Sequence, residues 1–109
     1  MAYKVVIQRR AEVDIALAYL YIVDQFAPNA AARWYRGIKA EIESFCEIPP
    51  HCLAAPESES LGFELKQIHY GKRTGAYRII FRVIEDENEV HVLTVRHGSM
   101  KPMESGDIG

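Results

Sequence analysis

Long apolar segments and cysteines are both scarce in this sequence of 109 residues. It contains no run of about 18 consecutive apolar residues, so we expect no membrane-spanning helix. The first five residues, Met1 to Val5, lack the basic end and the apolar run of a secretory signal. In a chain without such a signal, we expect the two cysteines, Cys46 and Cys52, to be reduced thiols and the protein to be cytoplasmic.

Sequence motifs for metal, cofactor or nucleophilic chemistry are also missing. The four histidines show no His-x-x-x-His spacing and the two cysteines no Cys-x-x-Cys spacing, so we expect no metal site. Residues 71–75 lack the Walker spacing and precede a predicted strand, which indicates a hairpin turn and no phosphate-binding loop. There is no Gly-x-Ser-x-Gly, and Cys46 falls near an apolar stripe, which favours a core thiol. No cofactor is therefore expected.

The distribution of charge is more informative than the net charge of −2, which gives no whole-molecule argument for nucleic-acid binding. Residues 1–65 carry six basic and nine acidic groups. Residues 66–84 carry five basic groups and no acid; these are Lys66, Lys72, Arg73, Arg78 and Arg82. The segment indicates either a local positive surface or a solvated sheet face that is balanced by the acids at 85–89.

The first half of the chain predicts a strand followed by two helices. Residues 3–8 are rich in β-branched side chains, as in a short strand. Apolar residues then recur at three- and four-residue steps in two runs: Ala11, Ile15, Ala18, Ile22 and Phe26, then Ala31, Trp34, Ile38, Ile42 and Phe45. Pro28 suits the first turn of the second helix, and Pro49 ends it. A connection this short predicts an antiparallel helical hairpin.

The first predicted helix carries apolar residues outside that stripe. Val13, Leu17 and Leu20 widen the stripe, which predicts a helix covered on more than one side. Exposed apolar patches mark partner surfaces, so we predict that Leu17, Leu20 and Tyr21 bind a protein partner. The alternative is that these residues pack internally or against a second copy of the chain.

The second half predicts one irregular segment followed by three strands. Residues 51–64 are irregular, and their polar tip, residues 57–60, is expected to be mobile. Residues 65–70, 76–84 and 90–96 read as an antiparallel meander. The predicted fold is a single α+β domain, 1–109, of order β-α-α-β-β-β, with a flexible tail at 99–109. Its helical hairpin packs on one face of a four-stranded sheet, and basic side chains can reach the other, partly open face.

Cleavage of RNA by attack of a 2′-hydroxyl is harder to dismiss than metal-dependent or nucleophilic hydrolysis. It needs a base, an acid and cations around the crowded phosphorane. The available cations are Lys72, Arg73, Arg78, Arg82 and Arg96. His97 is one titratable group near neutral pH, but a second proton-transfer group is missing. The alternative is that His97 merely caps the last strand.

Several segments resemble toxins of the RelE/ParE family, and the resemblance covers residues 3–99. The C-terminal hallmark is seen in Gly71-x-x-x-Gly75-x-Tyr77-Arg78-Ile79-Ile80-Phe81 and Val90-x-Val92-Leu93-x-Val95-Arg96-His97-Gly98. Residues 52–57 are similar to a Cys-Pro-Leu-Ala-Pro-Glu segment of one branch, from which Leu53 and Ala54 depart. The helix pattern fits at Ala11, Asp14-Ile15, Tyr21-Ile22 and Trp34.

The resemblance implies a microbial-ribonuclease-like domain from a type II toxin–antitoxin, or plasmid stabilisation, system. The implied partner is an antitoxin whose C-terminal segment wraps across the helices and the sheet. The implied target is DNA gyrase for ParE-like members, or messenger RNA in the ribosomal A site for RelE-like members. A homodimer and a toxin–antitoxin hetero-oligomer both remain open.

Departures from the family pattern favour the ParE-like branch. In a nuclease, Arg73, Arg78 and His97 would be catalytic, but the C-terminal tyrosine of RelE-like members is absent. Many relatives carry an arginine where this chain has Met100, so a phosphate-binding cation is also lost. In a gyrase inhibitor, the target-binding residues would be Lys72, Arg73, Arg78, Arg82 and Arg96. A third possibility is a degenerate member that binds an antitoxin without being toxic.

Overall fold

The computed structural model describes residues 2–71 and 76–98. Lys72 and Arg73, both predicted to bind the target, lie outside the described residues, as do Met100 and the predicted tail at 99–109. Helices and strands follow in the order β1 (Lys4–Ile7), α1 (Arg9–Gln25), α2 (Pro28–Glu43), β2 (Leu53–Ala54), α3 (Glu57–Leu61), β3 (Lys66–Tyr70), β4 (Tyr77–Ile84) and β5 (Glu89–His97). None of the described helices is long and apolar enough to cross a membrane.

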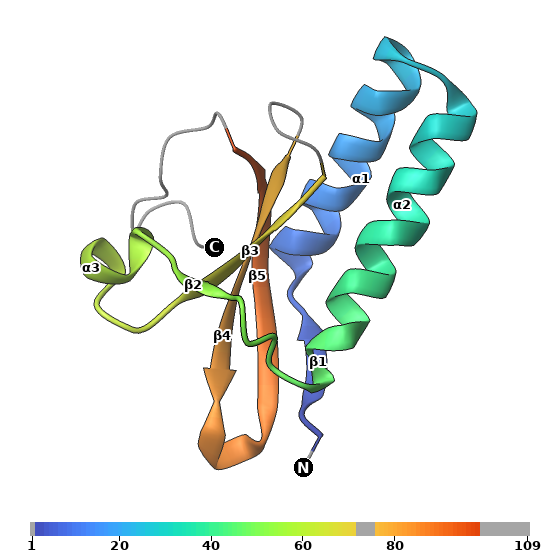
Figure 1. Cartoon of the computed structure of the whole chain (residues 1–109). Helices are drawn as coiled ribbons and strands as arrows, with labels where there is room; N and C mark the ends of the chain where they lie inside the picture. Colours follow the sequence, from blue (N-terminus) through green and yellow to red (C-terminus); the bar gives the residue numbers. More distant parts are fainter. Residues whose placement is uncertain (1, 72–75, 99–109) are drawn as a thin grey trace.

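A five-stranded sheet of order β1-β5-β4-β3-β2 forms the centre of the fold (Figure 1). β1 pairs parallel to β5, and the other neighbours are antiparallel. The β4–β5 register shifts between Ile80, opposite Thr94, and Phe81, opposite Val92, which leaves Leu93 as an extra residue of β5. The predicted α+β order is confirmed. The prediction of four strands missed β2, which is only two residues long.

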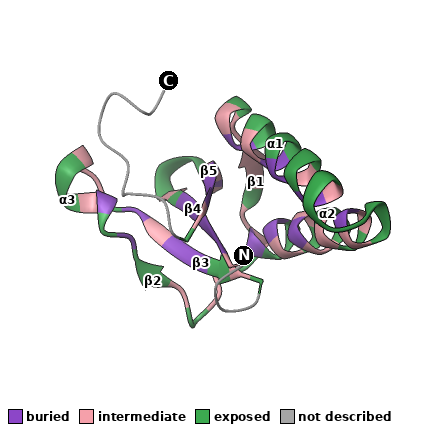
Figure 2. Cartoon of the chain, turned by 90° about the horizontal axis from the view of Figure 1, so that it is seen from above, coloured by how far each residue is buried: buried purple, intermediate pink, exposed green. Residues whose placement is uncertain are grey.

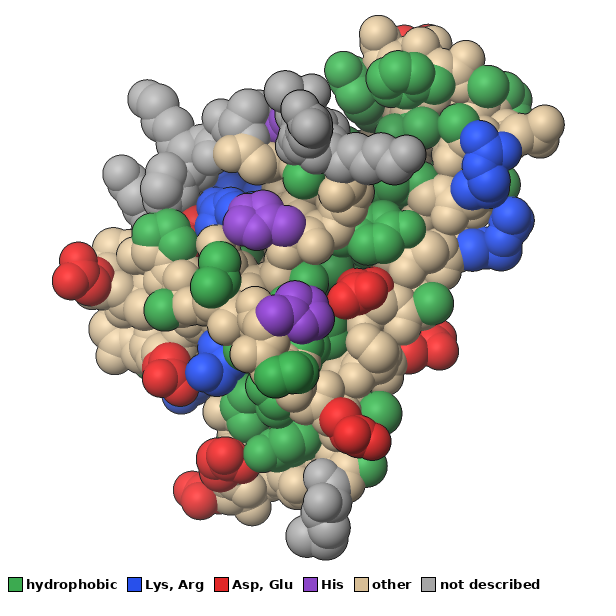
Figure 3. Space-filling model, viewed as in Figure 1, with side chains coloured by type: hydrophobic (Ala, Val, Ile, Leu, Met, Phe, Trp, Pro, Cys, Tyr) green, Lys and Arg blue, Asp and Glu red, His purple; other side chains and the backbone are tan. Residues whose placement is uncertain are grey.

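The predicted helical hairpin is confirmed, and it covers one face of the sheet. Figure 2, seen from above, shows α1 and α2 on one side of the sheet and α3 on the other. Pro28 occupies the first turn of α2, where its missing N–H leaves no bond unmade. The prediction that α1 is covered on more than one side is wrong, because Leu17 and Leu20 are exposed. Hydrophobic side chains are visible at the surface near the free end of the hairpin (Figure 3).

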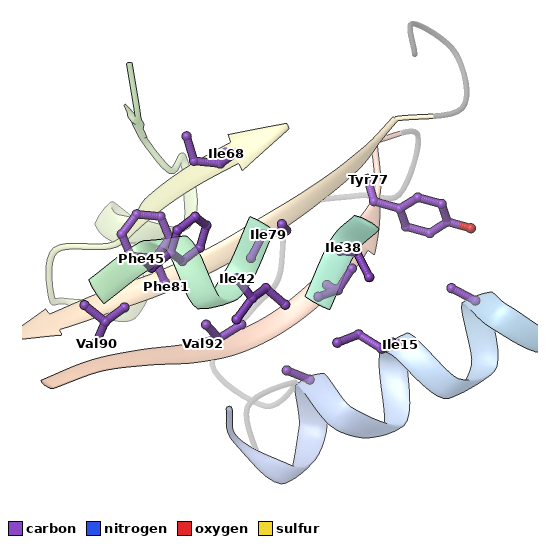
Figure 4. Close-up of a cluster of buried hydrophobic side chains, with 13 residues drawn as sticks. Ile15, Ile38, Ile42, Phe45, Ile68, Tyr77, Ile79, Phe81, Val90 and Val92 are labelled. Atoms are coloured by element: carbon purple, nitrogen blue, oxygen red, sulfur yellow. The ribbon is translucent and has the colours of Figure 1, made fainter. Parts of the chain in front are cut away.

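The main core lies between this hairpin and the sheet, as the close-up in Figure 4 shows. The buried faces of α1 and α2 are those that the helical period predicts; they consist of Ala11, Ile15, Ala18, Ile22, Ala31, Ile38 and Ile42. At its centre, the ring centroids of Phe45 and Phe81 lie 4.7 Å apart. Phe26 departs from the prediction because it caps the end of α1 and is 74% exposed.

Residues 53–65 cover part of the opposite face of the sheet. Ala55, Leu65 and Ile80 form a second small core there. The prediction of an irregular segment with a mobile polar tip is wrong for Glu57–Leu61, which form α3. Two features explain why this segment is ordered. Ser58 Oγ accepts a hydrogen bond from the Leu65 amide at 2.9 Å. The side chain of Glu57 is fully buried. The residues of this segment are mostly polar, but their polar groups form hydrogen bonds within the fold.

The two cysteines are free thiols, as predicted. The prediction of Cys46 as a core thiol is wrong, because its side chain is only partly buried in the short 3-10 helix after α2. Phe45 takes the buried position in that turn, and Cys52 packs against the core from the following segment. The prediction placed Cys46 by the α-helical period. At Ser44 the backbone changes to 3-10 geometry, which has fewer residues per turn, so Cys46 no longer lies on the buried face.

Candidate functional site

Arg78 and Glu57 form a buried ion pair on the sheet face that lies away from the hairpin. Arg78 Nη2 donates to Glu57 Oε2 at 2.7 Å, and Nη1 donates to Glu57 Oε1 at 3.1 Å. The same Nη1 donates to Gln67 Oε1 at 2.8 Å. Two parallel bonds from a guanidinium to one carboxylate are both directional and strong. The charge of Arg78 is therefore neutralised inside the protein.

Arg78 stands in a row of three basic side chains that crosses the sheet. In the strand register it lies opposite Arg96 of β5 on one side and His69 of β3 on the other. Residues directly opposite each other share a face of the sheet, and like charges in such positions destabilise it. Arg78 is 6% exposed and Arg96 is 8% exposed. The carboxylate that Glu57 brings to this row lowers the cost of burying its positive charge.

The predicted open basic surface is wrong for Arg78 and Arg96, because both side chains are buried. Glu57 of α3 covers Arg78 through their ion pair. The prediction holds for Arg82, which is exposed. The guanidinium of Arg82 stacks over the ring of Phe63, with 4.4 Å between its central carbon and the ring centroid. This contact leaves the edge of the guanidinium with its hydrogen-bond donors directed outward.

A groove of about 440 Å³ lies between α1 and the ends of β4 and β5. It brings residues of three elements together: Asp14, Leu17, Ala18, Tyr21, Tyr77, Val95 and His97. Two of the predicted partner-binding residues, Leu17 and Tyr21, thus share this groove with the predicted catalytic residue His97. Because α1 packs against the sheet beside β5, residues far apart in the sequence line this one groove. Figure 1 shows α1 next to β5.

Tyr77 and His97 line this groove side by side, and both side chains carry groups that can exchange protons. Their rings meet edge to face, with centroids 5.2 Å apart. Burial, and to a smaller extent the nearby Tyr21, raises the pKa of Tyr77 above its ordinary value of 10.0. Tyr77 is therefore a neutral phenol at physiological pH and holds its proton more tightly than an exposed tyrosine does. Its position beside His97 follows from their pairing across β4 and β5, which the periodic pattern alone could not specify.

Asp14 closes one side of the groove and is fully engaged in structural bonds. Its Oδ2 accepts hydrogen bonds from the hydroxyl of Thr94 and, at 3.1 Å, from the amide of Val95. Its Oδ1 faces Arg10 Nε at 3.4 Å. These contacts attach α1 to β5. The sequence singled out Asp14 only as part of a helix pattern.

The outer face of the hairpin carries a second groove, of about 470 Å³. It lies between α1 and α2 and is lined by Ala16, Tyr19, Leu20, Ala32, Tyr35 and Arg36. Leu17, Leu20 and Tyr21 are 61%, 60% and 55% exposed. The alternative that these three side chains pack internally is therefore excluded. They form one apolar surface with the two grooves on either side of α1.

Comparison with known proteins extends over almost the whole chain. The model of the family described as "ParE toxin of type II toxin-antitoxin system, parDE" matches residues 5–102. No curated protein sequence matches the chain. A structure of the chromosomal ParDE toxin–antitoxin system from P. aeruginosa is similar, with a TM-score of 0.64 and 18% identity, covering 88% of this chain and 96% of that one.

A second solved structure, a double mutant of the E. coli toxin RelE in the free state, is also similar. Its TM-score is 0.54 at 19% identity, and the match covers 91% of this chain and 86% of that one. At such low identities the two structures bear on the fold alone. They share the arrangement of a helical hairpin against a mixed sheet.

Proposed function

The chain belongs to the ParE toxin family of type II toxin–antitoxin systems, and from this membership we propose that it inhibits DNA gyrase by binding. In this proposal it is a cytoplasmic toxin that a cognate antitoxin holds inactive. The family implies the antitoxin partner, whereas the choice of gyrase rests on the residues of this chain.

The observation that carries the proposal is the bidentate ion pair between Arg78 and Glu57. A nuclease needs exposed cations to stabilise the charge that develops on the scissile phosphate. Arg78 is buried, and its guanidinium is bound by a carboxylate and by the amide oxygen of Gln67. This arrangement supports a toxin that acts through a docking surface, on which Arg82 is an exposed cation.

The antitoxin surface in this proposal is the apolar strip of α1 formed by Leu17, Leu20 and Tyr21, together with the two grooves beside it. Fully desolvated aromatic and aliphatic side chains supply most of the binding energy of protein interfaces. The groove with His97 at its floor would receive an apolar side chain of the antitoxin.

A ribosome-dependent endoribonuclease is the second candidate, and the contact between Tyr77 and His97 favours it. The phenol and the imidazole are the acid and base that cleavage by a 2′-hydroxyl requires. Arg73 would then supply positive charge at the phosphate. A degenerate relative that binds an antitoxin without toxicity is the third candidate, and the internal neutralisation of Arg78 fits it.

Two assays on the purified chain test the proposal: supercoiling by gyrase, and translation of a defined message followed by primer extension. We expect loss of supercoiling with an intact message. Arg82→Glu should raise the half-maximal inhibitory concentration about fivefold, equivalent to about 1 kcal/mol. Arg33→Glu, at an exposed cation of α2, is the matched control and should leave it unchanged.

Ribosome-dependent cuts that disappear in His97→Ala would replace this proposal with the nuclease. No loss of supercoiling and no cleavage of the message, together with tight antitoxin binding, would favour the degenerate relative. Antitoxin binding should fall only modestly in His97→Ala in either case, because Leu17, Leu20 and Tyr21 remain in place although His97 lines one of the two grooves.

A further inference from the structure

Glu87, Glu89 and His91 bring three potential metal ligands together at the turn between β4 and β5. One ligand atom from each side chain lies within 4.8 Å of the other two. Glu89 and His91 are two positions apart on β5, so they share one face of the strand. Glu87 ends the 3-10 turn that precedes Asn88.

Asn88 shapes the turn that brings Glu87 to the other two residues. It adopts the left-handed conformation, with φ 55°, which asparagine tolerates better than most residues. Its side-chain nitrogen donates to the carbonyl oxygen of Ala2 at 2.9 Å. The turn is thereby tied to the segment before β1, and the position of Glu87 relative to β5 is defined.

His91 is held by hydrogen bonds at both ring nitrogens. Its Nε2 lies 2.7 Å from Glu89 Oε1, and its Nδ1 lies 3.1 Å from Gln8 Nε2. In this arrangement Gln8 donates to Nδ1, and the proton on Nε2 is donated to Glu89. Rotating the Gln8 amide by half a turn places its oxygen against an Nδ1–H. The Nε2 lone pair is then available to a metal ion, while Gln8 orients the ring from behind, as outer-shell partners of metal-bound histidines do.

The carboxylates of Glu87 and Glu89 at this turn have no lysine or arginine partner among the described residues. Glu85 and Asp86 add two further carboxylates in the same turn. A divalent cation bound between the three side chains would offset the charge of both carboxylates.

We propose that Glu87, Glu89 and His91 bind one divalent transition-metal ion, with Zn²⁺ as the ion that fits best. An imidazole with two carboxylates suits zinc better than calcium or magnesium, which prefer oxygen ligands alone. The set provides three protein ligands and leaves a fourth position to water, as in an open tetrahedral site. The predicted absence of a metal site considered only His-x-x-x-His and Cys-x-x-Cys, and so missed this two-residue strand spacing.

The proposed site is separate from the groove at His97. Glu89 and His97 are the two ends of β5, a strand of nine residues, so the distance between them is about 27 Å. A metal ion there would link the β4–β5 turn to the junction of β1 and α1, because Gln8 at that junction contacts His91. Its expected effect is on folding stability, because a ligand that binds only the folded state stabilises it by mass action.

Calorimetric titration of the full chain, free of any affinity tag, with zinc chloride tests the proposal. We expect one ion per chain and a rise in the melting temperature. His91→Ala and Glu89→Gln should each weaken binding by about 10- to 100-fold. His69→Ala removes an exposed histidine of β3 and should leave binding unchanged. Circular dichroism of each variant checks that it has folded.

The free thiols require a second control, because thiolates also bind zinc. Cys46→Ser combined with Cys52→Ser should bind zinc as the unmodified chain does. Absence of binding to the unmodified chain would overturn the proposal. Binding that survives His91→Ala but disappears in the cysteine double variant would overturn it as well. Neither outcome bears on the gyrase assay, so this inference and the proposed function can fail independently.

Discussion

Arg78 and Glu57, 21 positions apart in the sequence, are joined by two hydrogen bonds of 2.7 and 3.1 Å in the interior of the protein. The pair links α3 to β4 and closes the sheet face opposite the helical hairpin. An arginine that looks from the sequence like a cation for the target is therefore a structural anchor, and the segment that carries Glu57 is ordered by it.

Glu57→Gln should destabilise the fold by about 3–5 kcal/mol, because it leaves the buried Arg78 charge without its carboxylate. Urea unfolding measures the change. Glu59→Gln, at an exposed position of the same short helix, should change stability by less than about 0.5 kcal/mol. Equal effects of the two substitutions would show that the ion pair is not what holds α3.

Gly37→Ala should lower stability, although alanine favours a helix over glycine by about 1 kcal/mol. A Cβ at position 37 would overlap Tyr70 Oη and would lie 3.0 Å from Tyr70 Cζ. Relief of this overlap requires movement of Tyr70 and costs about 1–3 kcal/mol. Thermal unfolding shows whether the substitution lowers or raises the melting temperature.

The double variant Gly37→Ala with Tyr70→Phe tests the cause of that loss. Removing the hydroxyl removes the closest overlap, so the alanine should cost less in the Tyr70→Phe background. Purely additive effects of the two changes would rule out the contact as the cause.

Asp14→Ala should destabilise the fold by about 1–3 kcal/mol, because the hydroxyl of Thr94 and the amide of Val95 lose their acceptor. Chemical denaturation gives the value. The control is Glu12→Ala on the same helix, where the carboxylate is half exposed and faces Lys39 at 3.4 Å. That surface pair is worth at most about 1 kcal/mol.

Leu17→Ala and Tyr21→Ala should each weaken antitoxin binding by about 2 kcal/mol or more, while leaving the melting temperature of the free toxin unchanged. Both side chains are exposed, so truncating them removes little packing within the chain. Leu53→Ala, at a similarly exposed leucine on β2, is the matched control. Titration calorimetry with the cognate antitoxin measures the affinity of each variant. A larger loss of affinity in Leu53→Ala would show that the antitoxin binds near β2 and not at α1.

Stability should fall as the pH rises above about 10, the ordinary tyrosine pKa. Burial raises the pKa of Tyr70, with a smaller contribution from Glu41, and burial also raises that of Tyr77. A raised folded-state pKa means that the folded protein holds these protons more tightly than the unfolded chain. The resulting stability is present below the unfolded pKa and is lost as the pH rises through the folded value.

Urea unfolding between pH 8 and 11 measures this slope. Tyr70→Phe and Tyr77→Phe should each make it shallower, because each removes one of the protons that the folded state retains. An unchanged slope in both variants would assign the loss of stability to other groups.

The sequence by itself determined the elements that have a local period. The apolar steps that end in Ile22 and Ile42 place the buried faces of α1 and α2 correctly, because side chains three and four residues apart share a helix face. The resemblance in the last third of the chain likewise identified the family. Leu17 and Tyr21 are apolar and lie outside the stripe, and the structure leaves both side chains exposed.

Only the tertiary structure decided which polar groups meet. Glu57 binds Arg78, Asp14 binds Thr94, and Tyr77 lies beside His97, each across a large separation in the sequence. A polar side chain has no periodic signal that names its partner, since any oppositely charged or hydrogen-bonding group can satisfy it. Its partner is selected when the apolar faces pack and exclude water, because burial then makes an unpaired charge too costly to keep.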